Sequence, residues 1–555
     1  MGNDTTTGSF TQGPNEVKAK PPDPVEYKKV ADEQDNLKRP YQIPSTYTKD
    51  TFDVLGGISE CPLIVFINSR SGGQQGSELT LAFNKSLGRA QVFDLSTSKP
   101  RDVLTKMWAN FDAAEAAGDH AARVYQKRLR ILVAGGDGTI AWVMGTLKSL
   151  DLTPVPPIAM MPMGTGNDLA RTFGWGPGFD ADWIKSHKSM FQTLKRIATS
   201  KLEHLDCWRL TLSLPRAELL GKLPYSLQRL PSDPASAEAT MASGMFWNYF
   251  SVGLDAQAAH GFHSLREKKP WLTAGRLTNQ AWYSIFSCNT GWFCCTKPLT
   301  SRVRNLKVQY LDSLTWVDIA VESHVKALVV LNLQSYAGGR NLWGKDDAPC
   351  FAQKAVKLPT YNDKMLEVVG LTSGLHTGMV MATKGSLLHA RRICQVSALR
   401  MDLQAQYLRS DGIPSHAYLQ VDGEPWVQDV PSTRDSQYIT VEISHCGTSQ
   451  VLRNVAGLHA TRQAGDSPDV VVAVQDPRDV LREQTLKMQP LVVTAEPVVG
   501  MDMIANAEAV TDSPAHMQAS LGHSTTSALT LGTEATTNVA MAGSSTITSF
   551  SSTMR

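Results

Sequence analysis

A glycine-rich turn in the first half of the chain has the composition of a phosphate-binding loop. The run GGDGT at 135–139 follows a short apolar segment and precedes a stretch with helical spacing. Adjacent glycines let successive backbone N–H groups turn inward, and the following helix adds the positive end of its dipole. The carboxylate of Asp137 would repel a bare phosphate, so it indicates a divalent cation or a hydroxyl awaiting deprotonation. The alternative is a tight strand-to-helix turn in which Asp137 is a cap.

Two further turns repeat this design. MGTGNDLAR follows an apolar run at its own strand end, and Asn167 or Asp168 can cap the helix that begins there. NSRSGG, at 68–73, supplies a third phosphate-sized turn. None of the three fits the P-loop pattern G-x-x-x-x-G-K-[ST] or the dinucleotide pattern G-x-G-x-x-G. Three such turns on one sheet would be an odd coincidence for simple connectors, so they indicate a phosphate site of another kind.

The elements that must position these turns alternate between strand and helix. Short apolar runs at 62–68, 91–96 and 129–135 predict strands, and each is followed by helical spacing or a glycine turn. This order predicts right-handed crossovers and a parallel sheet with helices on both faces. Because open α/β sheets place ligands at the carboxyl ends of their strands, we expect the three turns to lie together there.

From about residue 201 the pattern changes to short strands with alternating side chains. Examples are RVRNLKVQYLD at 302–312 and QYITVEIS at 437–444, while AYLQVDGEPW at 417–426 contains an Asp-Gly hairpin signal. The region is therefore predicted to be mostly antiparallel β, with one or two helices, for example at 376–392.

The predicted fold class is α/β, with a Rossmann-like parallel-sheet nucleotide domain and a mainly antiparallel β accessory domain between disordered tails. The lead and the tail are poor in large apolar residues and cannot offset chain entropy. The predicted parts are a lead at 1–55, the α/β domain at 56–205, the β-rich domain at 206–450 with an inserted loop at about 214–243, and a tail at 455–555.

Composition and charge exclude several classes of protein. The chain has 54 Lys and Arg against 52 Asp and Glu, which argues against a nucleic-acid-coating protein. Eight cysteines without a C-x-x-C pair argue against a zinc module or a disulfide scaffold and indicate reduced intracellular thiols. No apolar run reaches the ~18 residues of a membrane span. The start MGNDTT fits the myristoylation pattern at Gly2, without a second anchor nearby.

The motif set resembles the diacylglycerol kinases. GGDGT followed by PMGTGNDLAR looks like their catalytic domain, and the segments at 246–270, 331–344 and 421–426 are similar to their accessory domain. The resemblance covers about 61–450, and the missing cysteine-rich repeats make the chain look most like the short plant-type enzymes. GGDGT alone would also suit an NAD kinase or a sphingoid-base kinase, but GTGNDLAR resembles the diacylglycerol enzymes rather than these relatives.

The resemblance implies transfer of the γ-phosphoryl group of ATP, with Mg²⁺, to the free hydroxyl of diacylglycerol, giving phosphatidic acid in lipid signalling. Such a transfer needs positioning and charge neutralisation first and a modest base second. The implied nucleotide-binding residues are those of the three turns, namely Asn68, Ser71, Gly72, Gly73, Gly135, Gly136, Gly138, Thr139, Gly164, Thr165, Gly166, Asn167 and Asp168.

Three carboxylates have implied roles in the reaction. Asp137 is the first catalytic candidate, acting through Mg²⁺ or directly on the hydroxyl. Asp363 matches the suspected base of bacterial relatives, although Lys364 replaces the usual glycine of that motif. Glu424 resembles a residue that reaches the nucleotide or its metal, and its alternative is a hairpin-turn carboxylate in water. Asp137 and Glu424 are thus the predicted Mg²⁺ ligands.

Because diacylglycerol lies in bilayers, the resemblance also implies a cytoplasmic enzyme with peripheral membrane contact. The segment 279–295 concentrates aromatic side chains such as Trp282 and Phe286 near basic residues, which suits a headgroup interface, although a buried helix explains the same residues. The alternative functions are a sphingoid-base or ceramide-type lipid kinase and a catalytically silent lipid-binding scaffold of the same fold. Acyl-chain preference and oligomeric state are not indicated.

Overall fold

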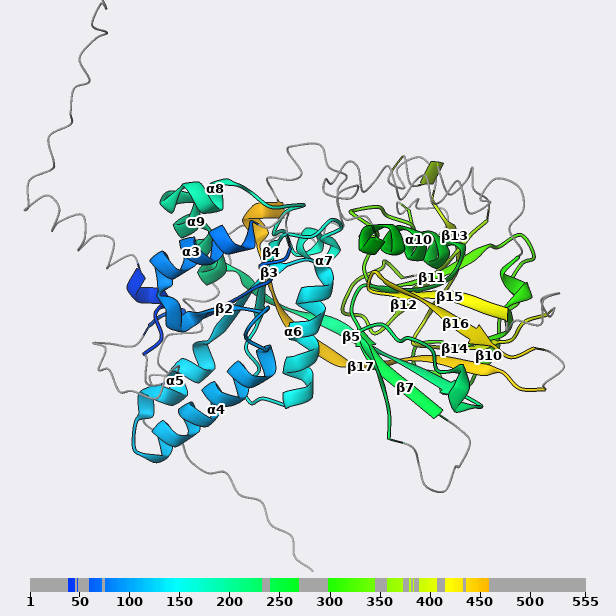
Figure 1. Cartoon of the computed structure of the whole chain (residues 1–555), viewed down its shortest axis with the longest axis horizontal. Coiled ribbons are helices and arrows are strands. Elements are labelled where there is room, and N and C mark those ends of the chain that lie inside the picture. Colours follow the sequence, from blue (N-terminus) through cyan, green and yellow to red (C-terminus); the bar gives the residue numbers. More distant parts are fainter. Residues whose placement is uncertain are drawn as a thin grey trace, which may run out of the picture. The chain divides into compact units, whose positions relative to one another are not determined.

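The structure is a computed structural model, and the residues it describes do not include every predicted segment (Figure 1). Most of the predicted lead and of the predicted tail lies outside the described residues, as do the aromatic segment at 279–295 and most of the helix expected at 376–392. The described part of the lead is ordered, so the prediction of disorder is wrong there: Tyr41, Ile43 and Tyr47 are buried, because these few apolar side chains pack into the core of the first domain. The described ranges are 38–44, 47, 59–71, 75–231, 240–268, 298–344, 357–372, 379–380, 383, 389–406, 415–432 and 436–458.

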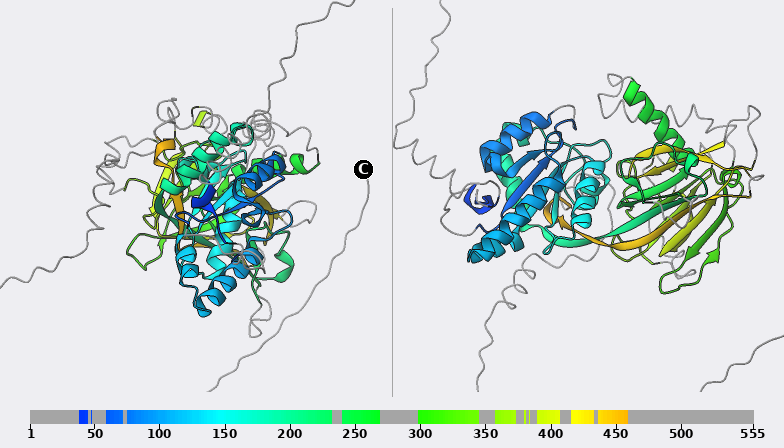
Figure 2. Two further views of the ribbon diagram at one scale, coloured as in Figure 1. Left: turned by 90° about the vertical axis from the view of Figure 1, so that its left-hand side faces the viewer. Right: turned by 60° about the horizontal axis from the view of Figure 1, so that its bottom comes forward.

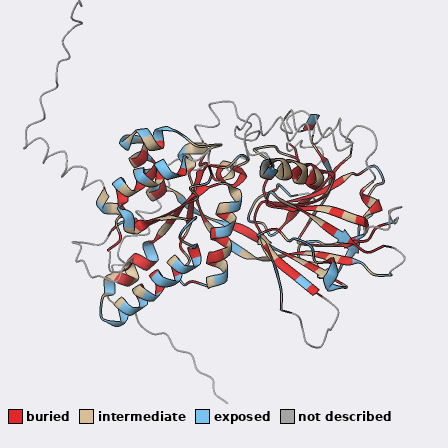
Figure 3. Cartoon of the chain, in the orientation of Figure 1, coloured by how far each residue is buried: buried red, intermediate tan, exposed pale blue. Residues whose placement is uncertain are grey.

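Four parallel strands form the sheet of the first domain, in the order β2–β1–β3–β4. β1 and β4 are buried at every residue, as their continuous apolar runs predicted (Figure 3). The bounds are β1 Leu63–Ile67, β2 Val92–Asp94, β3 Arg130–Gly135 and β4 Ile158–Pro162.

Helices cover both faces of this parallel sheet, as the alternation of elements predicted. α3 and α9 lie on one face, and α4, α5 and α6 lie on the other (Figure 1). α5 was not predicted separately from α4; it begins where Asp119 accepts a hydrogen bond from the Ala121 N–H. The bounds are α3 Gly76–Leu87, α4 Pro100–Ala116, α5 His120–Arg128, α6 Asp137–Leu150, α7 Asp168–Thr172, α8 Asp182–Lys185 and α9 His187–Thr199. Short 3-10 helices lie at η1 Arg39–Tyr41, η2 Arg89–Gln91, η3 Ala217–Leu219 and η6 Leu299–Ser301.

The second domain is mostly antiparallel β, as predicted. Among the described residues, six antiparallel strands form one sheet in the order β13–β12–β11–β8–β15–β16. This sheet shares an apolar core with the antiparallel part of the first sheet, and α10 (Leu254–Lys268) contacts four of its strands. The bounds are β6 Leu227–Arg229, β7 Thr240–Phe246, β8 Tyr249–Gly253, β9 Val303–Gln309, β10 Val317–Asp318, β11 Ala327–Leu331, β12 Leu366–Leu371, β13 Arg391–Val396, β14 Ala398–Leu403, β15 Ser415–Val421 and β16 Glu424–Val430.

Two long strands, β5 (Lys201–Leu214) and β17 (Ile439–Arg453), connect the two domains. They pair antiparallel along most of their length, and Val451 at the end of β17 pairs with Ile158 of β4 in parallel. The parallel and antiparallel strands therefore belong to one sheet, and Figure 2 shows the two long strands passing from one domain into the other.

These long strands differ from two boundaries drawn on the sequence. The predicted boundary at 205/206 falls inside β5, because a strand shared by two domains carries no change of composition at the point of passage. The stretch 214–243, predicted as an inserted loop, contains β6 and the start of β7, which pairs with β5. β6 is short and two of its three residues are exposed, so its apolar signal is weak.

Candidate functional site

The three glycine turns meet at the carboxyl edge of the parallel sheet, as predicted. The Asn68 Nδ2 of the first turn donates a hydrogen bond to the Thr139 Oγ1 of the second, at 2.9 Å. The second and third turns touch through backbone, since a Cβ on Gly164 would lie only 2.7 Å from the Cα of Gly136. Of the first turn's predicted nucleotide contacts, Ser71 is half-buried there, whereas Gly72 and Gly73 lie outside the described residues.

Several backbone donors of these turns are available to a ligand. Within the described part of the chain, the N–H groups of Asp137, Gly138, Thr165 and Gly166 have no protein acceptor. The first two belong to the opening turn of α6, where the helix dipole adds positive potential. Unpaired N–H groups at a helix start beside a glycine turn suit the oxygens of a phosphate.

The carboxylate of Asp137 joins the second turn to the third. Its Oδ2 accepts a hydrogen bond from the Asp168 N–H and its Oδ1 accepts one from the Leu169 N–H, both at 3.0 Å. Asp137 therefore caps α7 rather than its own helix α6, whose N-cap is Gly136. Burial, together with the nearby charge of Asp168, raises the pKa of Asp137 to about 7.

Asn167 holds the shape of the third turn. Its backbone is left-handed, with φ of 54°, and its side chain is buried. Its Oδ1 accepts from the Gly164 N–H, and its Nδ2 donates to the carbonyl oxygens of Gly164 and Pro177. Both amide hydrogens of the Asn167 side chain are therefore donated to backbone carbonyl oxygens of the protein, and the side chain stabilises the turn. The helix cap expected from Asn167 does not form.

Asp168 fastens the third turn to the second domain. Its carboxylate is 3% exposed, and its Oδ1 accepts from the Ser335 Oγ at 2.7 Å and from the N–H groups of Gly338 and Gly339 at 2.9 and 3.0 Å. These residues form the turn after β11, where both glycines have positive φ. The cap expected from Asp168 is therefore replaced by an interdomain contact, which the sequence reasoning missed. The only local signal was the glycine pair in SYAGGR.

The β15–β16 hairpin brings a second buried carboxylate near the site. Asp422 and Gly423 both have positive φ, at 45° and 85°, as an Asp-Gly hairpin turn requires. Asp422 accepts from the backbone N–H groups at 247–249, and burial raises its pKa to about 7. This carboxylate holds the hairpin against the connection between β7 and β8.

Glu424, just after that turn, faces the start of α6. Its Oε2 accepts from the Ser226 N–H at 3.1 Å and from the Ser226 Oγ at 3.0 Å. Its Oε1 lies 3.9 Å from where a Cβ on Gly138 would stand. The alternative of a hairpin carboxylate in water is therefore wrong, because Glu424 is half-buried and held beside the second glycine turn.

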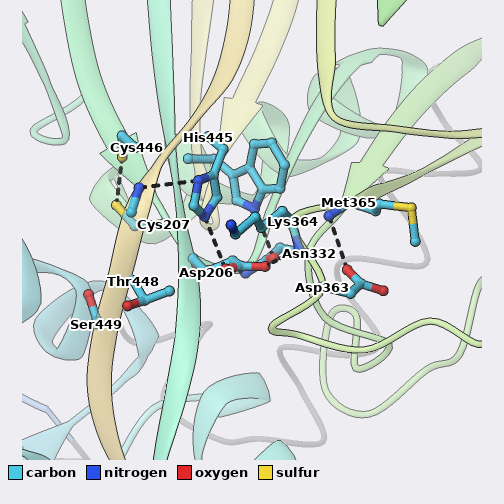
Figure 4. A network of polar contacts seen from close by, with 12 residues as sticks. Asp206, Cys207, Asn332, Asp363, Lys364, Met365, His445, Cys446, Thr448 and Ser449 are labelled. Atoms are coloured by element: carbon cyan, nitrogen blue, oxygen red, sulfur yellow. Dashed lines mark hydrogen bonds and ion pairs between the residues drawn. The ribbon is translucent and has the colours of Figure 1, made fainter. Parts of the chain in front are cut away.

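Asp363 lies in a different cluster, around Asp206 (Figure 4). Its Oδ1 accepts from the Met365 N–H at 3.0 Å, and burial raises its pKa. Lys364 has φ of 60°, so the turn keeps the left-handed geometry that glycine favours although lysine occupies it. Within the described ranges, no hydrogen bond or ion pair joins Asp363 to Asp137, to Glu424 or to the glycine turns.

The oxygen atoms near Gly166 fit a divalent cation. A Cβ there would lie 3.1 Å from the Asp168 Oδ2 and 3.3 Å from the Asp137 Oδ2. The described side chains include no group of three His, Cys, Asp or Glu that would hold a metal by themselves. Mg²⁺ commonly takes one or two carboxylates and completes its shell with phosphate oxygens and water. The donor set therefore suits a nucleotide-associated Mg²⁺ better than a structural metal.

Comparisons with known proteins match both domains of the chain. Residues 62–203 match the family model for the diacylglycerol kinase catalytic domain, and residues 245–425 match the model for the diacylglycerol kinase accessory domain.

Three plant proteins are similar over most of their length. Diacylglycerol kinase 4 of Arabidopsis thaliana is 38% identical over 395 residues, which is 68% of this chain and 78% of that protein. Diacylglycerol kinase 7 of the same plant is 35% identical over 432 residues, or 73% of this chain and 84% of that protein. Diacylglycerol kinase 1 of Oryza sativa subsp. japonica is 35% identical over 406 residues, or 69% and 78%.

Proposed function

Because the chain belongs to the diacylglycerol kinase family, we propose that it transfers the γ-phosphoryl group of ATP to the free hydroxyl of diacylglycerol. The product is phosphatidic acid. The observation that carries the proposal is the meeting of the glycine turns, with their unpaired N–H groups, beside the carboxylates of Asp137 and Glu424.

The phosphates of ATP are assigned to the turns after β1, β3 and β4. The N–H groups of Asp137 and Gly138 start α6, and those of Thr165 and Gly166 lie in the third turn, so both sets can donate to phosphate oxygens without breaking a protein hydrogen bond. Gly136 and Gly164 let the second and third turns lie in backbone contact, because any side chain at Gly164 would collide with the backbone of Gly136.

Asp137 and Glu424 are assigned to Mg²⁺, as the sequence suggested, and Asp168 supplies a further oxygen near Gly166. When bound, Mg²⁺ neutralises charge on the phosphates and so favours their attack by the hydroxyl oxygen. The chain's own part is positioning, because Asp137 ties the second turn to the third and Asp168 ties the third turn to the second domain.

The proton of the diacylglycerol hydroxyl needs an acceptor, and three carboxylates are candidates. Each oxygen of Asp137 already accepts a backbone N–H, whereas the Oε1 of Glu424 faces Gly138 and has no hydrogen-bond donor among the described residues. Asp363, the base that the resemblance implied, lies in the Asp206 cluster. The geometry therefore favours Glu424 or Asp137 over Asp363.

Isosteric variants separate these candidates. We expect Glu424→Gln and Asp137→Asn to lower kcat by a factor of about 100 or more, and Asp363→Asn to lower it by less than about 5, because general base catalysis contributes about 10²–10⁴-fold. The KM for ATP at fixed Mg²⁺ distinguishes the two roles: it should rise when a metal ligand is lost and stay unchanged when only the base is lost. An Asp363→Asn enzyme that folds normally and has lost its turnover would return the base role to Asp363.

A panel of neutral lipids tests the proposed substrate. In mixed micelles with labelled ATP, diacylglycerol should be phosphorylated well above sphingosine or ceramide. Equal transfer to a sphingoid base would support the related lipid kinase, and no transfer from folded wild-type protein would support a silent scaffold.

We also propose a cytoplasmic location and peripheral membrane contact, for which the aromatic segment at 279–295 is one candidate surface and a buried segment is the alternative. None of the described helices has the length and hydropathy needed to cross a bilayer. Trp282→Glu combined with Phe286→Glu should abolish liposome binding and leave the circular dichroism spectrum unchanged; global unfolding would instead support a buried segment.

Myristate labelling of wild type against Gly2→Ala tests the lipid-anchor pattern.

A further inference from the structure

Two thiols from distant parts of the chain face each other where the two domains join. The Sγ atoms of Cys207 on β5 and Cys446 on β17 are 3.0 Å apart, although the residues are 239 positions apart in sequence (Figure 4). Both are cysteines without a disulfide. A disulfide sets its sulfur atoms about 2.05 Å apart, so closing the bond requires an approach of about 1 Å.

The local backbone favours that approach. β5 and β17 are antiparallel neighbours, and their register shifts between His445 and Thr448, so Cys446 lies in a bulge opposite Cys207. Gly447 in this bulge has φ of 97°, a left-handed conformation that glycine adopts readily. Opposed residues of antiparallel strands have Cα atoms about 4.5–5.5 Å apart, which lies inside the range of natural disulfides.

The two thiols have different environments. Cys207 is fully buried, whereas Cys446 is half-buried. The side-chain hydrogen bond between the two thiols lowers the pKa of Cys446 to about 7, and the positive charges of Arg209 and Lys148 act in the same direction. The same contact, together with burial, raises the pKa of Cys207.

The groups around the pair include both signs of charge. Lys148, from α6, donates to the Thr448 carbonyl at 3.2 Å, and His445 lies 3.0 Å from the Asp206 carboxylate. Asp422 acts on Cys207 and opposes ionisation there. Cys446 is therefore the thiol poised to react first, and Cys207 is the one placed to react second.

We propose that Cys446 and Cys207 form an oxidation site that a small peroxide converts to a disulfide between β5 and β17. The Cys446 thiolate attacks one peroxide oxygen, the O–O bond breaks, and the products are a sulfenic acid and, after protonation, water. The Cys207 sulfur then attacks the Cys446 sulfur, the S–O bond breaks, and the hydroxyl leaves as a second water with the Cys207 proton. Two thiols are oxidised to one disulfide and one peroxide is reduced to two waters.

The position of the site links it to the kinase reaction. The crosslink ties together the two strands that run from the parallel sheet into the antiparallel sheet. Lys148, which contacts the bulge, lies near the end of α6, and the other end of α6 carries the second glycine turn. Closing the disulfide shifts the bulge, so we expect oxidised enzyme to have several-fold lower turnover; this expectation rests on the proposed function.

Peptide mapping of full-length protein tests the chemistry. Reduced protein is treated with hydrogen peroxide, remaining thiols are alkylated, and a non-reducing digest is searched for the peptide pair joining Cys207 to Cys446. Wild type and the matched control Cys394→Ser, which removes another half-buried thiol, should both give the pair. Cys446→Ser should not, and in Cys207→Ser dimedone should trap a sulfenic acid on Cys446.

The outcomes decide the proposal without depending on any variant that unfolds. If folded wild-type protein gives no crosslinked pair, and Cys446 stays fully alkylatable after excess peroxide, the site does not exist. In the activity arm, peroxide should lower turnover of wild type and of Cys394→Ser, dithiothreitol should restore it, and Cys446→Ser should resist. Equal loss in Cys446→Ser would overturn the link to turnover. A reduced wild type without kinase activity would instead overturn the proposed function and leave the mapping result standing.

Discussion

Replacing Asp137 by alanine separates the two roles that the structure gives this carboxylate. Asp137 accepts the N–H groups of Asp168 and Leu169 at the start of α7, and it is also a proposed ligand of Mg²⁺. Loss of an N-cap residue costs about 0.5–2 kcal/mol. Because two amides lose their acceptor here in a half-buried place, we expect the free energy of unfolding to fall by about 2 kcal/mol, at the upper end of that range.

This loss of stability is too small to remove activity. Each kcal/mol shifts Tm by about 2–4 °C in a domain of 150–250 residues, so we expect a drop of about 4 °C in this larger chain. A protein with about 5 kcal/mol or more of stability stays about 99% folded at 25 °C after losing 2 kcal/mol. A fall in turnover of about 100-fold or more at that temperature must therefore come from the reaction itself.

The assay pairs thermal melts by circular dichroism with phosphate transfer to diacylglycerol in mixed micelles at saturating ATP and Mg²⁺. Ser186→Ala is the matched control, because Ser186 caps α9 by accepting from the Ser189 N–H. It should lower Tm by a similar or smaller amount and keep full turnover. An Asp137→Ala enzyme with lower Tm and nearly wild-type turnover would reduce Asp137 to a helix cap. An unchanged Tm would refute the capping contacts.

Three further substitutions test contacts elsewhere in the fold. Asp168→Ala leaves three donors of the second domain without this acceptor, namely the buried Ser335 hydroxyl and the part-buried N–H groups of Gly338 and Gly339. A buried donor left unpaired costs about 1–3 kcal/mol, so Tm should fall further than in Asp137→Ala, and a change under 1 °C would contradict the interdomain contact. Lys364→Gly relieves a left-handed backbone and should add about 1 kcal/mol in urea unfolding, a gain that Lys364→Ala should not reproduce. Burial raises the pKa of Glu367 well above its usual value, so the folded chain keeps a proton that the unfolded chain has lost. Its contribution to stability is full below the unfolded pKa of about 4.3 and is lost as pH rises through the folded pKa. Glu367→Gln should flatten this decline in the free energy of unfolding when it is measured from about pH 5 upward. An unchanged slope would contradict the raised pKa of Glu367.

Local sequence determined the parallel sheet, the helices that directly follow its strands, and the place of the glycine turns. Continuous apolar runs such as PLIVFIN can be satisfied only by strands covered on both faces, and β1 is buried throughout. Parallel strands bring their carboxyl ends to one edge, so the turns after β1, β3 and β4 had to meet. The GGDGT and GTGNDLAR motifs also identified the family. These properties depend on neighbours along the chain and on the rules of sheet topology.

The tertiary structure alone decided which partner each polar side chain has. Asp137 caps a helix 31 residues away, Asp168 binds a turn 170 residues away, and Cys207 meets Cys446 across 239 residues. Such contacts produce no repeating pattern in the sequence, because each one needs only a single suitable residue in each of the two segments. The same holds for β5 and β17, whose alternating segments are typical of an antiparallel sheet although β17 also pairs with the parallel one. Hydrogen-bond partners and shared strands depend on how distant segments pack, and local sequence patterns do not predict that packing.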